Sequence, residues 1–395
     1  DSALGRQRRL NSVGESVLQI APSAAAAYSL RSLTGGDPVV VRVRRSSNNA
    51  EQDFTSSGVS SGALTSFVNE IQTLGTVTNS VGNDGFTLTN KSSTGFTATT
   101  DTATGVCGWP YTAESGDKIT VSFDAVVRSG TPQFIPRKAT ALSGSNLVDV
   151  VSDSAISVNS TASYSFEFTY DSDEAGSLTF SEGDDNADFD ISNFKVTAFK
   201  GAGLVETWYD QSGNSNDAVQ ATAGNQPLVV FSGVVLSGLD FDGSTSSRTL
   251  VAPSVTGLAG SLSIFSVSVR DATGNTVSLS NSSSGGRYFA IQEGGSTSVA
   301  NPRNTASITV SDSVSGANRL TFAVTTGATS TSVGANSSAV TTSTSDYGDD
   351  FSGSHINQIA IGVLRTASPT GYFNGRINEI LVYNSAQTDN RTAVE

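Results

Sequence analysis

Sulfur and imidazole are almost absent from this sequence. Among 395 residues there is one cysteine, Cys107, one histidine, His355, and no methionine. A single cysteine excludes a disulfide within the chain. Cys107 lies between Val106 and Gly108, which favours a small buried hydrophobe over a reactive thiol. A Ser-His-Asp triad or a histidine-rich metal site would depend on His355 alone, so we expect this residue to be an exposed loop histidine.

The ends of the chain also lack expected features. Without an initiator methionine, the chain is predicted to be processed or a fragment. Residues 388–395 begin like a helix, with Asp389 and Asn390 as good capping residues, and stop before two turns are complete. We therefore expect further residues after Glu395.

Positive charge and long apolar runs are scarce as well. Lysine and arginine number 22 against 36 acidic residues, which gives a net charge of −14 and a pI near 4.5. This balance argues against nucleic acid as a partner, because phosphate binding requires a basic face. Arg6, Arg8 and Arg9 are interpreted as part of a solvated N-terminal arm, residues 1–19. No window reaches the roughly 18 apolar residues that span a bilayer, so no membrane insertion is predicted.

What the sequence does contain is an antiparallel β pattern. Short alternating runs recur between Gly, Ser and Asn clusters, and charged residues are only 15% of the chain. In residues 118–127 apolar side chains alternate with mostly polar ones, which predicts a strand with one wet face. The phase changes near Ser192 and Asn193, where we predict a β-bulge. One short amphipathic helix is predicted from Leu64, Phe67, Val68 and Ile71.

Two distant segments carry a family resemblance. Residues 27–53 contain Ala-Tyr-Ser-Leu-Arg-Ser-Leu and Val-Arg-Val-Arg-Arg-Ser-Ser, and residues 207–218 read Thr-Trp-Tyr-Asp-Gln-Ser-Gly-Asn-Ser-Asn-Asp-Ala. Together they resemble the concanavalin-like sandwich of the α-L-arabinofuranosidase B catalytic domain, a module that also recurs in phage virion proteins. Residues 371–384 look like the last strands of laminin-G or concanavalin-like sandwiches. The resemblance implies a discontinuous sandwich, residues 20–69 and 205–395, interrupted by an inserted domain, residues 70–204.

The inserted domain resembles the jelly-roll carbohydrate-binding modules of bacterial glycosidases. The resemblance rests on residues 116–124 and 188–196. Exposed aromatic rings on such modules stack on sugar faces, and Trp109 and Tyr111, which flank Pro110, are the candidates. Core packing is an equally good interpretation of Trp109. For Trp208 we favour a buried strand.

A retaining glycoside hydrolase needs two carboxyl groups roughly 5 Å apart. Glu293 is the one residue that can be matched to the family's nucleophile strand, and Glu379 lies in the closing strand, where we expect a structural role. Where the family carries its acid, this chain continues to Arg365 with no carboxylate, and the vicinal cysteines of the family's sugar pocket are missing. We therefore expect no enzymatic activity.

The second segment contains Asp210 and Asp217, separated by a glycine and two asparagines. This composition is typical of an Asx-rich turn whose side chains satisfy the loop backbone, so the run is predicted to mark the fold. Arg44, Arg45 and Asp53 are predicted to be its polar partners.

One acidic loop, residues 182–190, offers hard oxygen ligands of the kind that calcium prefers. Asp184, Asp185 and Asp188 are the candidate metal ligands. The loop lacks the spacing of an EF-hand, and a solvated acidic turn is the default interpretation. No other cofactor is predicted.

Taken together, the sequence predicts an all-β protein of two β-sandwiches, or jelly rolls, one inserted into the other, with few short helices. By resemblance we expect a non-enzymatic virion decoration, fibre or appendage protein that associates with itself and with other virion proteins, and that binds a cell-surface glycan through the insert. The alternatives are a secreted glycoside hydrolase with a binding module and a bacterial surface adhesin.

Overall fold

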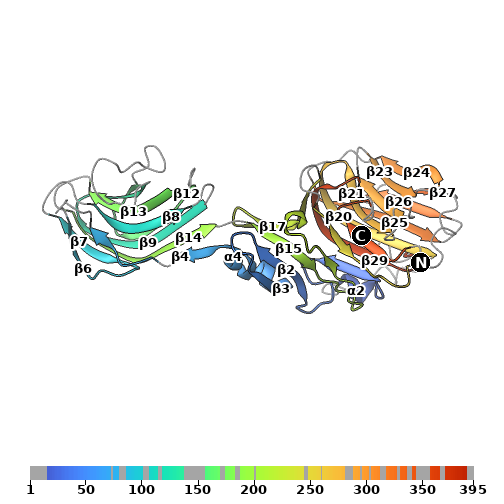
Figure 1. The fold of residues 1–395 in the computed structure, drawn as a ribbon, viewed down its shortest axis with the longest axis horizontal. Coiled ribbons are helices and arrows are strands. Elements are labelled where there is room, and N and C mark those ends of the chain that lie inside the picture. The colour runs from blue at the N-terminus through green and yellow to red at the C-terminus, as the bar shows by residue number, and fades with distance from the viewer. Residues whose placement is uncertain are drawn as a thin grey trace, which may run out of the picture. The chain divides into compact units, whose positions relative to one another are not determined.

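The computed structural model divides the chain into two compact units, which Figure 1 draws as ribbons. One unit, here the host unit, comprises Asp1–Ser66 and Ala202–Glu395, and the other, the inserted unit, comprises Phe67–Gly201. The sequence prediction had placed these boundaries after residues 69 and 204. The structure describes residues 16–72, 74–79, 86–100, 106–113, 118–137, 156–169, 174–182, 187–199, 202–243, 248–258, 260–280, 288–293, 296–301, 304–311, 317–326, 330–335, 340–343, 356–364 and 370–388.

The inserted unit is built from two antiparallel sheets. One has the order β11-β10-β13-β8-β5, and the other has the order β12-β9-β14-β7-β6, with β4 also pairing β14. The strands are β4 (Glu70–Gln72), β5 (Thr78–Asn79), β6 (Phe86–Thr89), β7 (Phe96–Thr100), β8 (Val106–Ala113), β9 (Lys118–Ser129), β10 (Pro132–Arg137), β11 (Ile156–Ser157), β12 (Ala162–Thr169), β13 (Glu174–Glu182) and β14 (Asp188–Phe199).

The alternation in the sequence accounts for the central strands of this unit. Along β9 the buried positions are Ile119, Val121, Phe123 and Ala125, and the positions between them are partly exposed. The predicted bulge in β14 is confirmed, since its register against β9 shifts between Ser192 and Lys195. Asn193 has a left-handed φ of 53° at that point, a conformation that asparagine tolerates better than most residues.

The core of the inserted unit is aromatic. Trp109 stacks on Phe194 with ring centroids 3.9 Å apart, and further phenylalanine rings meet at tilted or edge-to-face angles around them. The buried aromatic residues of this core are Phe86, Phe96, Trp109, Tyr111, Phe123, Phe134, Phe168, Phe180, Phe189 and Phe194. Cys107 is fully buried among them, as predicted, and burial raises the pKa of its thiol.

The host unit contains the remaining elements, of which nearly all are strands. Its helices are α2 (Val17–Ile20), α3 (Ser56–Ser60), α4 (Ala63–Val68), which contains the boundary between the units, and the 3₁₀ turn η2 (Ala223–Asn225). The strands are β1 (Ala26–Ser29), β2 (Val39–Arg45), β3 (Glu51–Thr55), β15 (Gly203–Trp208), β16 (Ala218–Val219), β17 (Leu228–Phe231), β18 (Val234–Asp242), β19 (Leu250–Ala252), β20 (Ser261–Ala272), β21 (Gly274–Ser280), β22 (Tyr288–Glu293), β23 (Ser296–Asn301), β24 (Asn304–Ser311), β25 (Arg319–Thr326), β26 (Thr331–Ala335), β27 (Thr341–Ser343), β28 (Gln358–Ile361) and β29 (Asn374–Tyr383).

The predicted helix is shorter than its apolar pattern indicated. α4 contains Leu64, Phe67 and Val68 and ends there, while Ile71 belongs to β4. Ile71 pairs with Thr197 of β14. The fourth apolar position of the predicted helix is therefore part of a strand of the inserted unit.

Two ladders of strands can be followed through the host unit. One runs β27-β26-β25-β20-β29, and β1 and β18 pair successive stretches of β29. The other runs β24-β23-β22-β21-β28-β19-β16-β15-β2-β3. β17 links the two ladders, because it pairs with β15 of the second ladder and with β18, which pairs with β29 of the first. The all-β, sandwich-like fold class predicted from the sequence is therefore confirmed.

The first and last strands of the host unit lie side by side. β1 is antiparallel to β29, with Ala26 opposite Val382 and Ser29 opposite Glu379. The Tyr383 hydroxyl donates to the carbonyl of Ala21 at 3.0 Å. This pairing brings the loop that follows β1 next to the closing strand, where a groove of the unit is found.

Candidate functional site

A groove of about 820 Å³ opens on the host unit beside β1 and β29. The loop after β1 contributes Arg31 and Ser32, the region of α3 contributes Ser57 and Ser60, and β29 contributes Glu379. Leu236, Val267 and Leu320 add apolar surface to the same lining. This volume lies within the range of small-molecule sites, about 300 to 1,000 Å³. We call it the Arg31 groove.

Arg31 and Glu379 form a two-pronged ion pair in this groove. The guanidinium donates from Nε to Oε2 and from Nη2 to Oε1, both at 2.9 Å. The Arg31 side chain is 57% exposed and that of Glu379 is 12% exposed. Burial raises the pKa of Glu379, although Arg31 and Ser29 act in the opposite direction. The pair therefore presents a fixed, half-exposed guanidinium to the groove.

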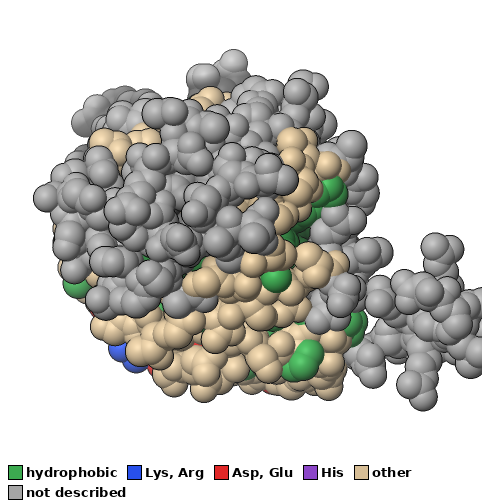
Figure 2. Space-filling view, turned by 90° about the vertical axis from the view of Figure 1, so that its right-hand side faces the viewer, with side chains coloured by type: hydrophobic (Ala, Val, Ile, Leu, Met, Phe, Trp, Pro, Cys, Tyr) green, Lys and Arg blue, Asp and Glu red, His purple; other side chains and the backbone are tan. Residues whose placement is uncertain are grey.

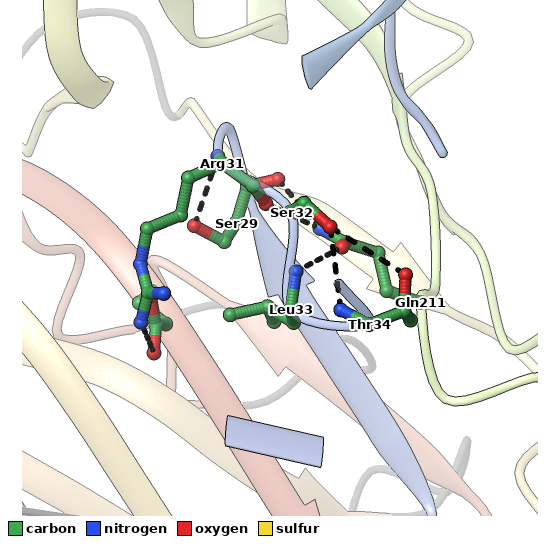
Figure 3. A network of polar contacts seen from close by, with 7 residues as sticks. Ser29, Arg31, Ser32, Leu33, Thr34 and Gln211 are labelled. Carbon is green, nitrogen blue, oxygen red and sulfur yellow. Dashed lines mark hydrogen bonds and ion pairs between the residues drawn. The ribbon is translucent and has the colours of Figure 1, made fainter. Parts of the chain in front are cut away.

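Gln211 holds the loop that carries Arg31 (Figure 3). Its buried side chain accepts a hydrogen bond from the backbone of Leu33 at 2.8 Å and donates to the carbonyls of Ser29 and Arg31 at 3.0 Å. Buried backbone groups that lose their hydrogen-bond partner cost free energy. The glutamine of the second sequence segment is therefore a positioning residue for the groove.

Asp37 is the other carboxylate of the groove lining. It accepts hydrogen bonds from Ser56 Oγ at 2.8 Å, from the backbone N of Ser57 at 2.7 Å and from Ser57 Oγ at 2.6 Å. These donors hold the pKa of Asp37 well below its usual range. Asp37 therefore remains charged and fixes the start of α3 against the groove.

The two carboxylates of the groove are already committed to donors of the host unit. Glu379 accepts the Arg31 guanidinium, and Asp37 accepts the three donors from Ser56 and Ser57. A glycosidase needs one carboxyl group to attack or activate water and another to protonate the leaving group. Side chains engaged in this way are better suited to binding a polar ligand than to either task.

Glu293, the candidate nucleophile, is fully buried at the end of β22. It accepts hydrogen bonds from Ser268 Oγ at 2.7 Å and from Thr321 Oγ1 at 3.2 Å. Burial raises its pKa, and the charged neighbours that oppose this rise are Arg319 and Arg270. Glu293 is thus held between the two ladders of the host unit among basic and hydroxyl groups, and it is not part of the lining of the Arg31 groove.

The structure places the predicted sugar-stacking residues in the core. Trp109 is 0% exposed and Tyr111 is 4% exposed. Stacking on a sugar requires an accessible ring face, so the exposure on which this prediction depended is absent. The alternative interpretation of Trp109, core packing, is the arrangement seen. The prediction for Trp208 holds, since it is fully buried in β15.

Of the predicted calcium ligands, Asp184 and Asp185 lie outside the described residues, as does His355. Asp188 begins β14 and forms an ion pair with Arg128 at 2.7 Å. Arg128 also binds Asp190. Within the described ranges, no cluster of three or more acidic, cysteine or histidine side chains could hold a metal ion.

The segment 207–218 forms the structural loop that its composition predicted. Asp210 accepts from the backbone N of Ala27 at 2.8 Å, and Asp217 accepts from the backbone N of Asp210 at 2.9 Å. The predicted partners were partly wrong. Arg44 binds Gln226, Asn49 and the carbonyl of Ala223, whereas Asp53 pairs with Arg42 and accepts from the Tyr209 hydroxyl.

The residues of the Arg31 groove were not predicted from the sequence as a binding site. Arg31 and Gln211 both lie in the two segments that carried the family resemblance, but their contact joins positions about 180 residues apart. Glu379 was predicted to be structural. A polar residue such as Arg31 directly after a buried strand was the available signal, since strand ends commonly carry binding residues.

Comparisons with known proteins give no family assignment. No protein-family model matches the chain, and no curated protein matches it. Among solved structures, the NanB sialidase of Streptococcus pneumoniae is similar over 40% of this chain at 17% identity, with a TM-score of 0.33. The chain spans only 27% of NanB.

Two further structures are similar at the same level. The CBM40 module of the Ruminococcus gnavus IT-sialidase matches 39% of this chain and 90% of its own length at 15% identity, with a TM-score of 0.31. A mutant of the Trypanosoma rangeli sialidase matches 74% of this chain and 58% of its own length at 12% identity, with a TM-score of 0.34. TM-scores this low define neither a shared fold nor a shared function.

Proposed function

We propose that this protein is a non-enzymatic, glycan-binding structural protein, displayed on a phage particle as a decoration, fibre or appendage, and that the Arg31 groove is its glycan site. The observation that carries the binding site is the Arg31–Glu379 pair, fixed at one wall of a groove lined by serine hydroxyls. The particle location rests on the resemblance of residues 27–53 and 207–218 to a module found in virion proteins.

The groove offers the groups that sugar recognition uses. A planar guanidinium presents several N–H donors in a fixed fork, and serine hydroxyls both donate and accept. Leu236, Val267 and Leu320 supply apolar surface against which the C–H face of a sugar ring can pack.

On the face drawn in Figure 2, the described atoms are mostly backbone and uncharged polar side chains, with small separate hydrophobic areas. None of the described helices is long and apolar enough to cross a bilayer.

A glycan array with the full chain tests the binding function. Arg31→Met keeps the apolar stem and removes the guanidinium, and we expect it to weaken binding about tenfold or more, because a charge-assisted hydrogen-bond donor is lost. Arg42→Met is the matched control, since Arg42 forms an equivalent two-pronged pair with Asp53 outside the groove. Equal effects of the two substitutions, or no binding to any glycan, would contradict the groove as the site.

The same samples distinguish binding from hydrolysis. We expect no reducing sugar to be released from arabinan or from the bound glycans after prolonged incubation. Release that disappears in Glu293→Gln would instead establish the glycoside hydrolase alternative.

Particle location and self-association are tested separately. We expect peptides of this chain in purified virions, and sedimentation of the purified chain as a symmetric oligomer. A chain found only in culture medium or on a cell surface would favour the secreted hydrolase or the adhesin.

A further inference from the structure

A second cavity of the host unit lies beside the loop 210–217. It has a volume of about 520 Å³. Its walls come from Ser23 to Ala25 before β1, from Ser212, Asn214 and Asn216, from Thr256 and Gly257, and from Asn384 after β29. It shares no lining residue with the Arg31 groove. We call it the asparagine pocket.

The lining of the asparagine pocket carries no charged side chain. Asp210, an acidic residue of the same loop, accepts hydrogen bonds at both of its carboxylate oxygens. Its Oδ1 accepts from the backbone N of Ala27 and Ser212, and its Oδ2 accepts from Ser212 Oγ and the backbone N of Asn216. The carboxylate therefore orders the loop and leaves the pocket itself neutral.

The orientation of two amides is fixed by the backbone. The Nδ2 atoms of Asn214 and Asn216 donate to the carbonyls of Ala24 at 2.8 Å and Ala25 at 2.7 Å. A carbonyl only accepts, so these bonds orient the NH₂ side of each amide toward the segment before β1. The Oδ1 atoms are then the acceptors that both asparagines can offer to a ligand.

Two positions at the rim have a left-handed backbone. Ser23 has a φ of 67°, which is uncommon for a residue with a side chain, and Gly257 has a φ of 80°. A Cβ at Gly257 would lie 3.5 Å from Asn384 Nδ2. That distance is an ordinary van der Waals contact, so glycine is favoured here by its left-handed backbone and not by lack of space.

We infer that the asparagine pocket binds a neutral saccharide unit. Sugar hydroxyls are donors for the Oδ1 atoms of Asn214 and Asn216, and they are donors and acceptors for Thr256 and Asn384. An ionic ligand finds no counter-charge among the lining residues. The lining also contains no aromatic ring, so recognition depends on hydrogen bonds and the affinity is weak, about millimolar. This site does not depend on the Arg31 groove being a glycan site.

The test uses the full chain and neutral methyl glycosides of glucose, galactose, mannose and arabinofuranose, each titrated to about 50 mM in saturation-transfer NMR. Thr256→Val with Asn384→Ala removes two hydrogen-bonding groups of the rim without touching the Asp210 network. We expect this double variant to bind the preferred glycoside about tenfold more weakly. Thr222→Val, an exposed threonine whose side chain makes no capping bond, is the control and retains binding.

The outcomes separate this site from the groove. Arg31→Met is expected to leave methyl glycoside binding unchanged. Binding lost in Arg31→Met and kept in the double variant would assign all sugar binding to the groove and overturn the inference. Absence of binding by every glycoside, or binding of calcium ions that the double variant abolishes, would also overturn it. Fluorescence in a Trp109→Phe background, in which Trp208 of the host unit is the remaining tryptophan, verifies that the host unit of each variant is folded.

Discussion

The interiors of the two units are built from different side chains. The inserted unit packs rings on rings around Trp109 and Phe194. The host unit buries hydroxyl and charged groups between and around its ladders, among them Ser268, Thr321 and Glu293. Within the described residues, Ser266 Oγ and Glu293 Oε2 are buried without a hydrogen-bond partner. Aromatic packing gives a unit stability, whereas buried polar groups oppose folding unless they are matched.

The comparison shows that aromatic content is a poor guide to the binding surface in this protein. The unit that is rich in rings uses the rings named above for its core. The host unit, in which aromatic residues are a smaller share of the chain, contains the Arg31 groove and the asparagine pocket, and serine and asparagine side chains occur in both linings. Because each unit contains one fully buried tryptophan, Trp109 in one and Trp208 in the other, their stabilities can be followed separately.

The largest expected effect is in the aromatic core. Trp109→Ala removes a fully buried ring that contacts Phe194 and Phe96, and we expect a loss of about 3 to 5 kcal/mol in the free energy of unfolding of the inserted unit. Urea unfolding measured by circular dichroism shows the shift, and Trp208 fluorescence reports the host unit. An equal decrease in the free energy of unfolding of the host unit would show that the two units do not unfold independently.

A smaller effect is expected from the polar interior. Glu293→Ala leaves Ser268 and Thr321 without their acceptor and removes the negative charge near Arg319 and Arg270. We expect the host unit to lose about 3 kcal/mol, because a buried charge cluster loses one member. Glu293→Gln retains an acceptor and is expected to lose less. The measurement is urea unfolding followed by Trp208 in a Trp109→Phe background. A more stable alanine variant would show that this carboxylate is dispensable.

Gln211→Leu tests how the loop of the groove is held. It removes three hydrogen bonds to the backbone of Ser29, Arg31 and Leu33. We expect a loss of about 1 to 3 kcal/mol together with weaker glycan binding, because Arg31 loses its fixed position. Gln220→Leu, which removes a side chain that bonds to Thr249 outside the groove, is the comparison. Unchanged binding by Gln211→Leu would separate the glutamine from the site.

The smallest expected effect is a difference in pH response. Glu293 and Glu379 of the host unit have raised pKa values, chiefly because of burial. The folded host unit then holds more protons than the unfolded chain above the ordinary glutamate pKa, so its stability falls as pH rises from about 4.5 toward neutrality.

In the inserted unit, the pKa of Asp190 is lowered by Arg128 and that of Asp124 by Ser163 and Asn193. Their contribution is present above the ordinary aspartate pKa and is lost as pH falls through lower values. Between about pH 4.5 and neutrality, urea unfolding followed by each tryptophan in turn should show the host unit losing stability as pH rises, whereas Asp190 and Asp124 give the inserted unit no slope there. Below about pH 4, the stability of the inserted unit should fall as pH falls. A host unit whose stability rises between about pH 4.5 and neutrality would contradict the assigned pKa directions.

The strands of both units could be predicted because alternation is a local property. The β14 bulge was located from the change of phase at Ser192 and Asn193, and it is present. The same alternation, applied to β8, predicts that Trp109 and Tyr111 are buried and therefore argues against a sugar-stacking role for them. Cys107, Trp109 and Tyr111 are two residues apart, so a buried Cys107 places both rings on the buried face.

The groove could not be predicted in this way. Its central ion pair joins Arg31 to Glu379 and depends on the pairing of β1 with β29, which no local pattern specifies. The choice of Arg42 over Arg44 as the partner of Asp53 depends on the β2–β3 register, in which Arg42 lies directly opposite Asp53. A shift of two residues would place Arg44 opposite Asp53 instead.

The division of the host unit also governs the order in which the protein assembles during synthesis. β2 must wait for β15, its partner beyond the whole of Phe67–Gly201, and β1 must wait for β29 near the end of the chain. Every strand of the inserted unit, by contrast, is synthesised before β15. An insert that folds at once draws its two ends together and shortens the loop that the host strands must close. The interruption of one domain by another can thereby serve as an internal folding aid for the domain that it interrupts.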